Sequence, residues 1–424
     1  MVIIVVLLVV LLVVLLVAGA CFCYCSQYSR RMGECEVHRL FMVMFVFLLV
    51  GLAPGLAAQD VHDPDETPEA PPAPEEEAPG QDGAPVATAE EQDWGFVPIP
   101  IIGYSPDTGV LMGASGFLYW QPESNETSTD NSTASLALMY GTRGVFQAPS
   151  GVTLNLADGR YKSESDFYIG RAPSDFFGIG PDTDSGDQEV YTTFRLNAES
   201  AFLFRLGPGL YVGPVARWNY QDMVDTENGE IIETQEPTGY DGNRSGGGGG
   251  KLVWDTREPQ LYPFSGQRLT FAATGNPDAL STTDGFSRFS LDYRRYYSPW
   301  ENHVLALQGI ARAALGDPPF TALPALGGQN ELRGYPEGRY RDNVSLQGQL
   351  EYRFPIWWRF GGVLFGAAGE VAPAFDELSF SDPAAAGGLG LRFTLDRRQN
   401  LNLRFDFAVS REGTSFYVSF REAF

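Results

Sequence analysis

Cysteine is scarce in this chain of 424 residues and is confined to its beginning. The four cysteines are Cys21, Cys23, Cys25 and Cys35. Beyond residue 35 the chain can therefore form neither a disulfide bond nor a cysteine-ligated metal site. The acidic segment 221–243 could hold a divalent cation, but its composition is that of a solvated loop, and we predict no metal site.

Histidine is also rare, which restricts acid–base chemistry. The three histidines are His38, His62 and His303. A lipase or protease needs a positioned base, and only His303 lies in the body of the chain, far from any suggestive serine motif. The glycine run 246–250 lacks the Lys-Ser/Thr that follows a phosphate-binding loop. We therefore expect no enzymatic activity and no cofactor, and we interpret His303 as a residue at the barrel rim.

Basic residues are few: 29 Lys and Arg stand against 53 Asp and Glu, for a net charge of −24. This excludes nucleic acid as an expected partner, because phosphate binding needs a basic patch. Part of the acidity is local. Residues 59–93 combine many prolines with the run Glu75–Glu77 and few large apolar residues, too few to bury a core. We predict a disordered, acidic, proline-rich linker there.

Long hydrophobic runs are missing after residue 58, where none approaches the roughly 18 to 20 residues that a spanning helix needs. A helical membrane fold is thereby excluded for the body of the chain. Before that point, the apolar run 40–53 follows basic residues and leads to Gly55-Leu56-Ala57-Ala58. This order is typical of a signal peptide. We predict a signal peptide at 32–58 with cleavage near Ala57 or Ala58.

An earlier Val/Leu repeat, at 2–20, has no basic residue before it. We interpret residues 1–31 as a mis-annotated upstream segment, with Met32 as the true start. A lipoprotein box at Ala18-Gly19-Ala20-Cys21 and a twin-arginine signal at Arg30-Arg31 are the alternatives.

From Trp94 onward the sequence alternates with period two, the repeat of a β-strand. In the segment 401–409 one face carries Leu401, Leu403, Phe405, Phe407 and Val409, and the other carries Asn402, Arg404, Asp406 and Ala408. Segments 346–354, 389–395 and 416–424 repeat the pattern. An apolar face towards lipid and a charged face towards a wet interior are typical of a membrane barrel. We predict that residues 94–424 form an all-β, transmembrane antiparallel barrel; a soluble β-sandwich is the alternative.

Fifteen strands can be counted, and bacterial single-chain barrels have even numbers. The predicted strands are 108–120, 132–142, 146–157, 161–170, 188–206, 209–220, 246–254, 266–275, 285–297, 302–314, 345–354, 361–372, 386–395, 400–410 and 415–424. We expect sixteen, with the missing strand between 121 and 187. Short turns at 206–209 and 298–300 fit the periplasmic rim, and the loops 121–131, 221–245 and 315–344 fit the outer face.

One long loop carries Leu332-Arg333-Gly334-Tyr335, and the next strand contains Glu351 in Glu-Tyr-Arg-Phe-Pro. With PIPIIGYSPDTG at 98–109, FFGIG at 176–180 and the ending FYVSFREAF, the chain resembles the barrel of the BamA/TamA-like outer-membrane assembly family, also called bacterial surface antigen proteins. The resemblance covers about residues 94–424. It implies that loop 315–344 folds into the lumen.

Arg333 would be costly to leave unpaired inside a narrow lumen, and the alternation turns Glu351 inward. We therefore expect an ion pair between them, with Gly334 allowing close approach. The alternative is that Arg333 sits at a solvated tip while Glu351 pairs with Arg353 or Arg392. The family's aspartate on the following strand is replaced by Ala367. Glu370 is a second candidate anchor, provided that a bulge turns it inward.

Assembly factors of this family carry periplasmic POTRA modules, for which the linker 59–93 has no room, so the chain resembles the branch that lacks them. The resemblance implies insertion or transport of an unknown protein or lipid client at a weak seam between first and last strands. Gly109 and Gly113 would weaken that seam opposite Phe416–Phe424. A passive pore or structural barrel is the alternative.

The ending places Phe416, Phe420 and Phe424 on the predicted outer face. It resembles the signal by which outer-membrane barrels reach the assembly machinery of the cell. The expected location is the outer membrane of a Gram-negative cell, with outer-membrane lipid and that machinery as partners.

Overall fold

The structure is a computed structural model that describes residues 94–105, 109–120, 131–227, 230–259, 262–396, 401–420 and 422–424. The predicted upstream segment 1–31, signal peptide 32–58 and linker 59–93 lie outside these residues.

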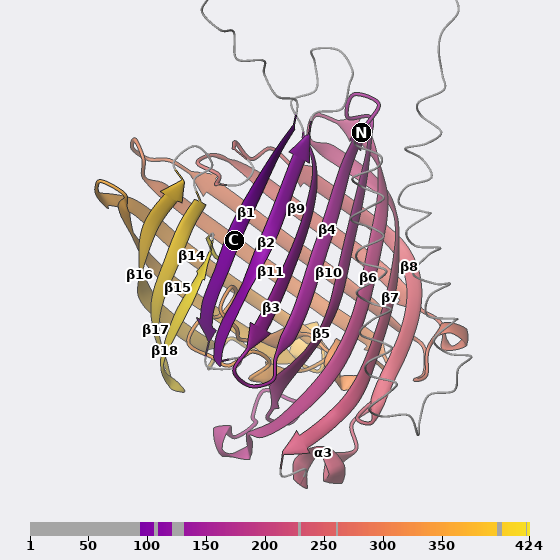
Figure 1. The fold of residues 1–424 in the computed structure, drawn as a ribbon. Coiled ribbons are helices and arrows are strands. Elements are labelled where there is room, and N and C mark those ends of the chain that lie inside the picture. Colours follow the sequence, from indigo (N-terminus) through magenta and orange to yellow (C-terminus); the bar gives the residue numbers. More distant parts are fainter. Residues whose placement is uncertain are drawn as a thin grey trace, which may run out of the picture.

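In the described part of the chain, sixteen antiparallel strands close into one barrel (Figure 1). Each strand pairs with its neighbours in sequence order, and the first and last strands meet. The strands are β1 (Trp94–Ser105), β2 (Gly109–Trp120), β3 (Ser132–Gly141), β4 (Phe146–Leu156), β5 (Tyr161–Phe176), β6 (Glu189–Gly207), β7 (Leu210–Glu227), β8 (Gly242–Asp255), β9 (Gly266–Asn276), β10 (Phe286–Tyr297), β11 (Val304–Gly316), β14 (Val344–Trp357), β15 (Phe360–Ala372), β16 (Ala384–Asp396), β17 (Leu401–Ser410) and β18 (Gly413–Phe420). The predicted fold class and strand number are confirmed.

The position of the sixteenth strand differs from the prediction. The described residues 131–187 contain the three strands that were counted there, and the sixteenth strand of the barrel is β1, which precedes all of them. Pro98 and Pro100 interrupt the strand pattern of β1, because proline is rare in paired strands. Both prolines are tolerated because β1 lies at the point where the barrel closes, and an edge strand needs no N–H donor on its unpaired side.

Exposure alternates along the strands as a membrane barrel requires. On β14, Leu350 is 43% exposed and its neighbour Glu351 is fully buried, and on β16, Leu391 and Arg392 differ in the same way. Apolar side chains therefore face outward, and charged ones face the interior. Among the described residues, no helix is long and apolar enough to cross a bilayer.

The two ends of the barrel differ. We call the end with Trp94 and residues 422–424 the terminal end and the other the loop end. Because the strands are antiparallel and consecutive, the short β6–β7 and β10–β11 turns lie at the terminal end and the β11–β14 connection lies at the loop end. The predicted loop 121–131 lies almost wholly outside the described residues; the strand ends that flank it, Trp120 and Ser132, are at the terminal end.

Short helices occupy the connections. They are α3 (Glu230–Gln235) and the 3-10 turns η1 (Ser185–Asp187), η2 (Asp278–Leu280), η3 (Phe320–Ala322) and η4 (Phe375–Glu377). At the loop end, Ile232 of α3 and Phe320 of η3 pack with Phe176 and Tyr191 in one buried cluster. This cluster covers the interior on the side of β5 and β6.

The segment 317–343 between β11 and β14 is the longest connection that is described throughout. Its strands β12 (Ala325–Leu326) and β13 (Tyr340–Arg341) pair with each other and not with the barrel. Leu326, Leu332 and Tyr335 are fully buried and pack against Val371 and Ala384. The segment therefore has an apolar core shared with β15 and β16.

Candidate functional site

The Arg-Gly-Tyr tip forms a tight turn against β17 and β18. The N–H of Tyr335 bonds to the carbonyl of Leu332 at 3.3 Å, and Gly334 has φ of +107°. The N–H of Gly334 donates to the hydroxyl of Tyr417 at 3.0 Å, and its carbonyl accepts from the hydroxyl of Ser410 at 2.7 Å. Both backbone groups of the glycine are thus satisfied by the barrel wall.

Glycine is required at this position for two reasons. The left-handed φ disfavours any side chain, and a Cβ would lie 3.2 Å from the Cβ of Ser410 and 3.3 Å from that of Ala386. The expected close approach of Gly334 is therefore present, and it is directed at β16 and β17.

Arg333 is 1% exposed and contacts two carboxylates. Its Nη2 donates to Oε1 of Glu351 at 2.6 Å, and its Nη1 donates to Oδ2 of Asp406 at 2.7 Å. The guanidinium also lies over the ring of Phe365, 3.6 Å from its centroid. Arg333 therefore connects the segment 317–343 to β14, β15 and β17 through charge-assisted bonds and a cation–π contact.

Asp406 is the anchor that the sequence reasoning missed. Its inward orientation was evident from the alternation along 401–409, but the second acid was sought on β15, near Ala367. The structure places the acid two strands further along, where a buried carboxylate meets Arg333. An inward-facing acid on a neighbouring strand was the available signal.

Glu370 is not an anchor, contrary to the second candidate. It lies at the loop-end half of β15, where its carboxylate accepts hydrogen bonds from the backbone N–H groups of Ser379 (3.3 Å) and Phe380 (2.6 Å). No bulge occurs at Glu370, which stays in register with Leu346. It orders the β15–β16 connection instead. Ala367 packs beside the cluster of Leu332 and Tyr335.

Further arginines surround the two carboxylates. Arg353 lies 2.8 Å from Glu351, and Arg392 contacts both Asp406 (2.5 Å) and Glu422 (2.7 Å). The alternative pairing of Glu351 with Arg353 therefore coexists with the Arg333 pair. Among the described residues Arg392 forms no ion pair with Glu351, because it engages Asp406 and Glu422.

The buried network holds more cations than anions. Arg333, Arg353, Arg392 and Arg404 face Glu351, Asp406 and Glu422. Arg404 is fully buried and bonds to the carbonyl of Gln329 and the side chain of Asn330, both in segment 317–343, at 3.1 Å. Its Nε and Nη1 have no hydrogen-bond partner among the described residues. Loss of any one carboxylate would leave buried positive charge uncompensated.

The seam lies between β1 and β18, so the predicted seam strand 108–120 is wrong. It is β2, which pairs with β1 and β3 along its length. Gly109 has φ of +71° next to the β1–β2 connection, and a Cβ on Gly113 would lie 2.0 Å from the carbonyl oxygen of Leu138. These glycines serve hairpin geometry and strand packing.

The carboxyl-terminal aromatic residues do not share one face. Phe416 is 45% exposed on the outer surface, as expected, and the side chain of Phe420 is outside the described part. Phe424 is buried beside Tyr296 and Val304, and its backbone oxygen accepts a bond from Arg353 at 3.0 Å. The outward prediction fails for Phe424 because β18 ends at Phe420.

The remaining sequence candidates lie at the rim and in the wall of the barrel. Nδ1 of His303 lies 2.8 Å from the hydroxyl of Tyr352, and its ring stacks on that tyrosine near Trp300. In the ranges that the structure describes, no three His, Cys, Asp or Glu residues gather as metal ligands. The glycines 246–250 lie within β8, opposite β7 and β9.

Comparisons with known proteins agree with this geometry. BamA from Haemophilus ducreyi lacking POTRA domains 1–3 matches with a TM-score of 0.52 and 13% identity, over 78% of this chain and 70% of that one. CdiB from Acinetobacter baumannii matches with a TM-score of 0.50 and 10% identity, over 78% of this chain and 60% of that one. Such identities show the fold alone.

No curated protein matches the sequence significantly. The family model described as the Omp85 superfamily domain matches residues 119–420, well over half of the chain. The protein therefore belongs to the Omp85 superfamily.

Proposed function

We propose that this protein inserts or transports a protein or lipid client at the β1–β18 seam, in the outer membrane of a Gram-negative cell. During this step the segment 317–343, which is anchored through Arg333, keeps the lumen closed. Barrels of the Omp85 superfamily are outer-membrane proteins. The cell's barrel assembly machinery is the proposed partner during biogenesis.

The weakness of the seam carries this proposal. β1 and β18 share a single registered pair, Tyr104 with Val418, whereas β1 pairs with β2 from Trp94 to Ser105. Few backbone hydrogen bonds hold this junction, so it opens at lower cost than any other. A route through the wall also leaves the anchored segment in place.

A disulfide across the seam tests the proposal. Because the chain has no cysteine after residue 35, Tyr104→Cys with Val418→Cys adds one defined pair. In cells whose only copy of the protein is this double-cysteine variant, oxidation should make the envelope permeable to detergent, and a reductant should restore it.

Met112→Cys with Tyr140→Cys is the matched control, because these outward residues are a registered pair between β2 and β3. Oxidation of the control should leave the envelope intact. A locked seam that leaves the envelope as intact as this control would refute the proposal.

A passive pore is the second candidate, because the interior of the barrel holds two cavities, one of which is bordered by segment 317–343. One has a volume of about 620 Å³ behind β1–β7, and the other about 710 Å³ between β6–β11 and residues 322–338. If they connect along the lumen, small ions would pass without opening of the seam.

A further inference from the structure

Two prolines on β1 determine what the seam can pair with. In an antiparallel pair, each residue directs its N–H and C=O to the same neighbour, and successive residues alternate. Proline has no N–H, yet Pro98 and Pro100 keep their register with β2. The residues between them, such as Ile99, must therefore carry the hydrogen bonds to β2. The backbone of Pro98 and Pro100 faces the seam, as does that of Tyr104, which pairs with Val418.

Other prolines of the barrel show the same effect. Pro214 stays in register with Gly250 on β8, while the β6–β7 register is interrupted opposite it, between Val212 and Val215. Pro149 stays in register with Tyr168 on β5, while the β3–β4 register is interrupted beside it. Each proline keeps one ladder and breaks the other. At the seam the broken side is the free edge of β1.

The carboxyl-terminal tail does not fill this edge. Continuing the register of Tyr104 with Val418 would place Pro100 opposite Glu422 and Pro98 opposite Phe424. Both tail residues are instead held inside, Glu422 by Arg392 at 2.7 Å and Phe424 beside Tyr296. Among the described strands, none lies against the Trp94–Ile101 part of β1 on its seam side.

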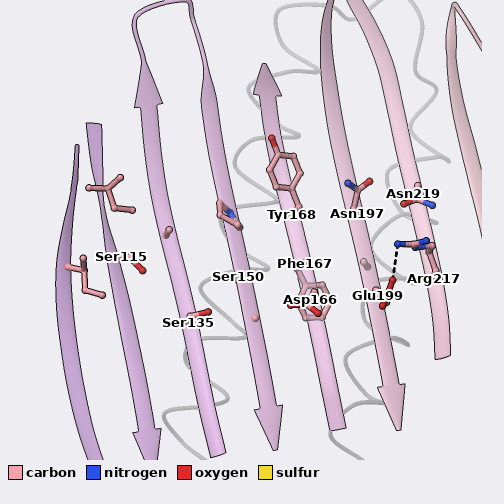
Figure 2. A pocket seen from close by; sticks show the side chains of 16 residues that line it. Ser115, Ser135, Ser150, Asp166, Phe167, Tyr168, Asn197, Glu199, Arg217 and Asn219 are labelled. Atoms are coloured by element: carbon pink, nitrogen blue, oxygen red, sulfur yellow. Dashed lines mark ion pairs between the residues drawn. The ribbon is translucent and has the colours of Figure 1, made fainter. Parts of the chain in front are cut away.

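Both faces of this edge are apolar. Phe96 and Ile102 are 58% and 60% exposed on the outside, and Ile99 and Ile101 face inward. The two isoleucines line the cavity of about 620 Å³, a size typical of ligand pockets. Figure 2 shows Ser115, Ser135 and Ser150 on β2, β3 and β4, the strands that follow β1 around the wall.

The opposite part of the cavity is polar. Asn197, Asn219 and the ion pair of Arg217 with Glu199, at 2.9 Å, lie on β6 and β7 (Figure 2). The cavity is therefore apolar at the two isoleucines of β1 and becomes polar along the wall, from the serines of β2 to β4 through Asp166 on β5 to β6 and β7. This is the order of chemistry in an amphiphile whose chain lies at the seam and whose head group lies towards β6 and β7.

We infer that the terminal-end half of the seam admits the acyl chain of a lipid, and that the cavity behind β1 receives it. The inference rests on the proposed function and specifies a lipid as its client. An acyl chain needs no backbone hydrogen bonds, so the missing donors cost it nothing. A client β-strand that paired with this edge would have carbonyl groups opposite Pro98 and Pro100 that receive no hydrogen bond, because proline has no N–H.

Fluorescence quenching by a chain-labelled lipid tests the inference. The full-length protein with Ser135→Cys carries a small thiol-linked fluorophore in the cavity and is reconstituted into phosphatidylcholine vesicles with a spin label on the acyl chain. Leu291→Cys, on the outer face of β10, is the positive control, and Ser290→Cys, in the other cavity, is the negative control. We expect quenching at position 135 at least threefold above that at 290.

Ile101→Asp places a charge on the route of the acyl chain and leaves the backbone edge of β1 unchanged. It should lower quenching at position 135 to the level at 290, with heat-modifiable migration unchanged. Quenching at 135 equal to that at 290, or unaffected by Ile101→Asp, would overturn the inference.

The double variant Pro98→Thr with Pro100→Thr restores two backbone N–H donors on the free edge of β1, and so distinguishes a lipid client from a β-strand client. It should not increase cross-linking of envelope proteins to a photoreactive group at Ile102; an increase would indicate a strand client and overturn the inference. The seam disulfide distinguishes failure of the acyl-chain inference from failure of the proposed function. If the disulfide makes the envelope leaky but no lipid quenching is seen at position 135, the proposed function stands and the acyl-chain inference alone is refuted.

Discussion

At the scale of single residues, Arg333 shows why a loop can be held by few contacts. A guanidinium offers five donors in a fixed plane, and here two carboxylates and an aromatic ring receive it. Glu351 also contacts Arg353, and Asp406 also contacts Arg392 and Arg404, so the first acid pairs with two cations and the second with three. The acids are therefore more critical than any one arginine.

The first prediction compares Asp406, the second anchor in the structure, with Glu370, the second anchor expected from the sequence. Asp406→Asn should destabilise the barrel by about 3 to 5 kcal/mol, because a broken buried ion pair leaves charge unpaired. Glu370→Gln should cost only about 0 to 1 kcal/mol, because its contacts are near the surface. Urea unfolding of the reconstituted barrel, followed by heat-modifiable migration, measures both. Equal losses would show that Asp406 is no anchor.

The second prediction separates backbone strain from steric crowding at the tip. Gly334→Ala should cost about 1 to 3 kcal/mol from the unfavourable φ, with an added cost from the Cβ contacts to Ser410 and Ala386. Gly328 is the control, because its φ is +93° and its Cβ would meet nothing closer than 3.6 Å. In the same unfolding assay, Gly334→Ala should lower the free energy of unfolding more than Gly328→Ala does. If both variants lose a similar amount of stability, backbone strain alone is the cause.

At the scale of elements, β18 and its tail have separate roles. The strand ends at Phe420 and the following residues turn into the barrel, where Phe424 packs beside Tyr296 and Arg353 bonds to its backbone. Because residues 422–424 lie inside the barrel and not in the sheet, they do not pair with β1. The arrangement that buries Phe424 therefore leaves this edge of β1 without a partner strand among the described residues.

The third prediction concerns this tail. Phe424→Ala should destabilise the folded barrel by about 3 to 5 kcal/mol, the usual cost of removing a buried phenylalanine, and deletion of Phe424 should lower outer-membrane insertion more than synthesis. Phe416→Ala, on the outer face, should cost much less. Membrane fractionation and unfolding of the purified barrel give the two readouts. Normal insertion of the truncated chain would contradict the expected signal.

At the scale of the whole molecule, the interior contrasts with the overall charge of −24. The larger cavity is lined by the cations Arg217, Lys251, Arg268, Arg288, Arg294 and Arg312 and by the acids Glu199, Asp292, Glu331 and Glu337. Segment 317–343 closes one side of it, and Arg312 reaches that segment through Glu331 at 2.5 Å. The lumen is therefore more basic than the chain.

The fourth prediction follows from this lining. In planar bilayers the wild-type protein should give little or erratic current, while Arg333→Ala should raise conductance because segment 317–343 loses its anchor. The open variant should prefer anions, since cations outnumber acids along the larger cavity. Glu370→Gln is the control. A large, steady wild-type current would instead favour the passive pore.

The sequence by itself determined the barrel and the facing of Glu351 and Asp406, because these follow from a period of two along each strand. The number of sixteen came from fifteen counted strands and the even strand number of bacterial barrels. It also placed Arg333 and Gly334 together at one tip. Contacts between distant strands left no such local trace. Only the tertiary structure decided that Asp406 supplies the second carboxylate, that Glu370 does not, and that β1 is the seam strand. Register and closure depend on all sixteen strands together, whereas alternation is a property of each strand alone.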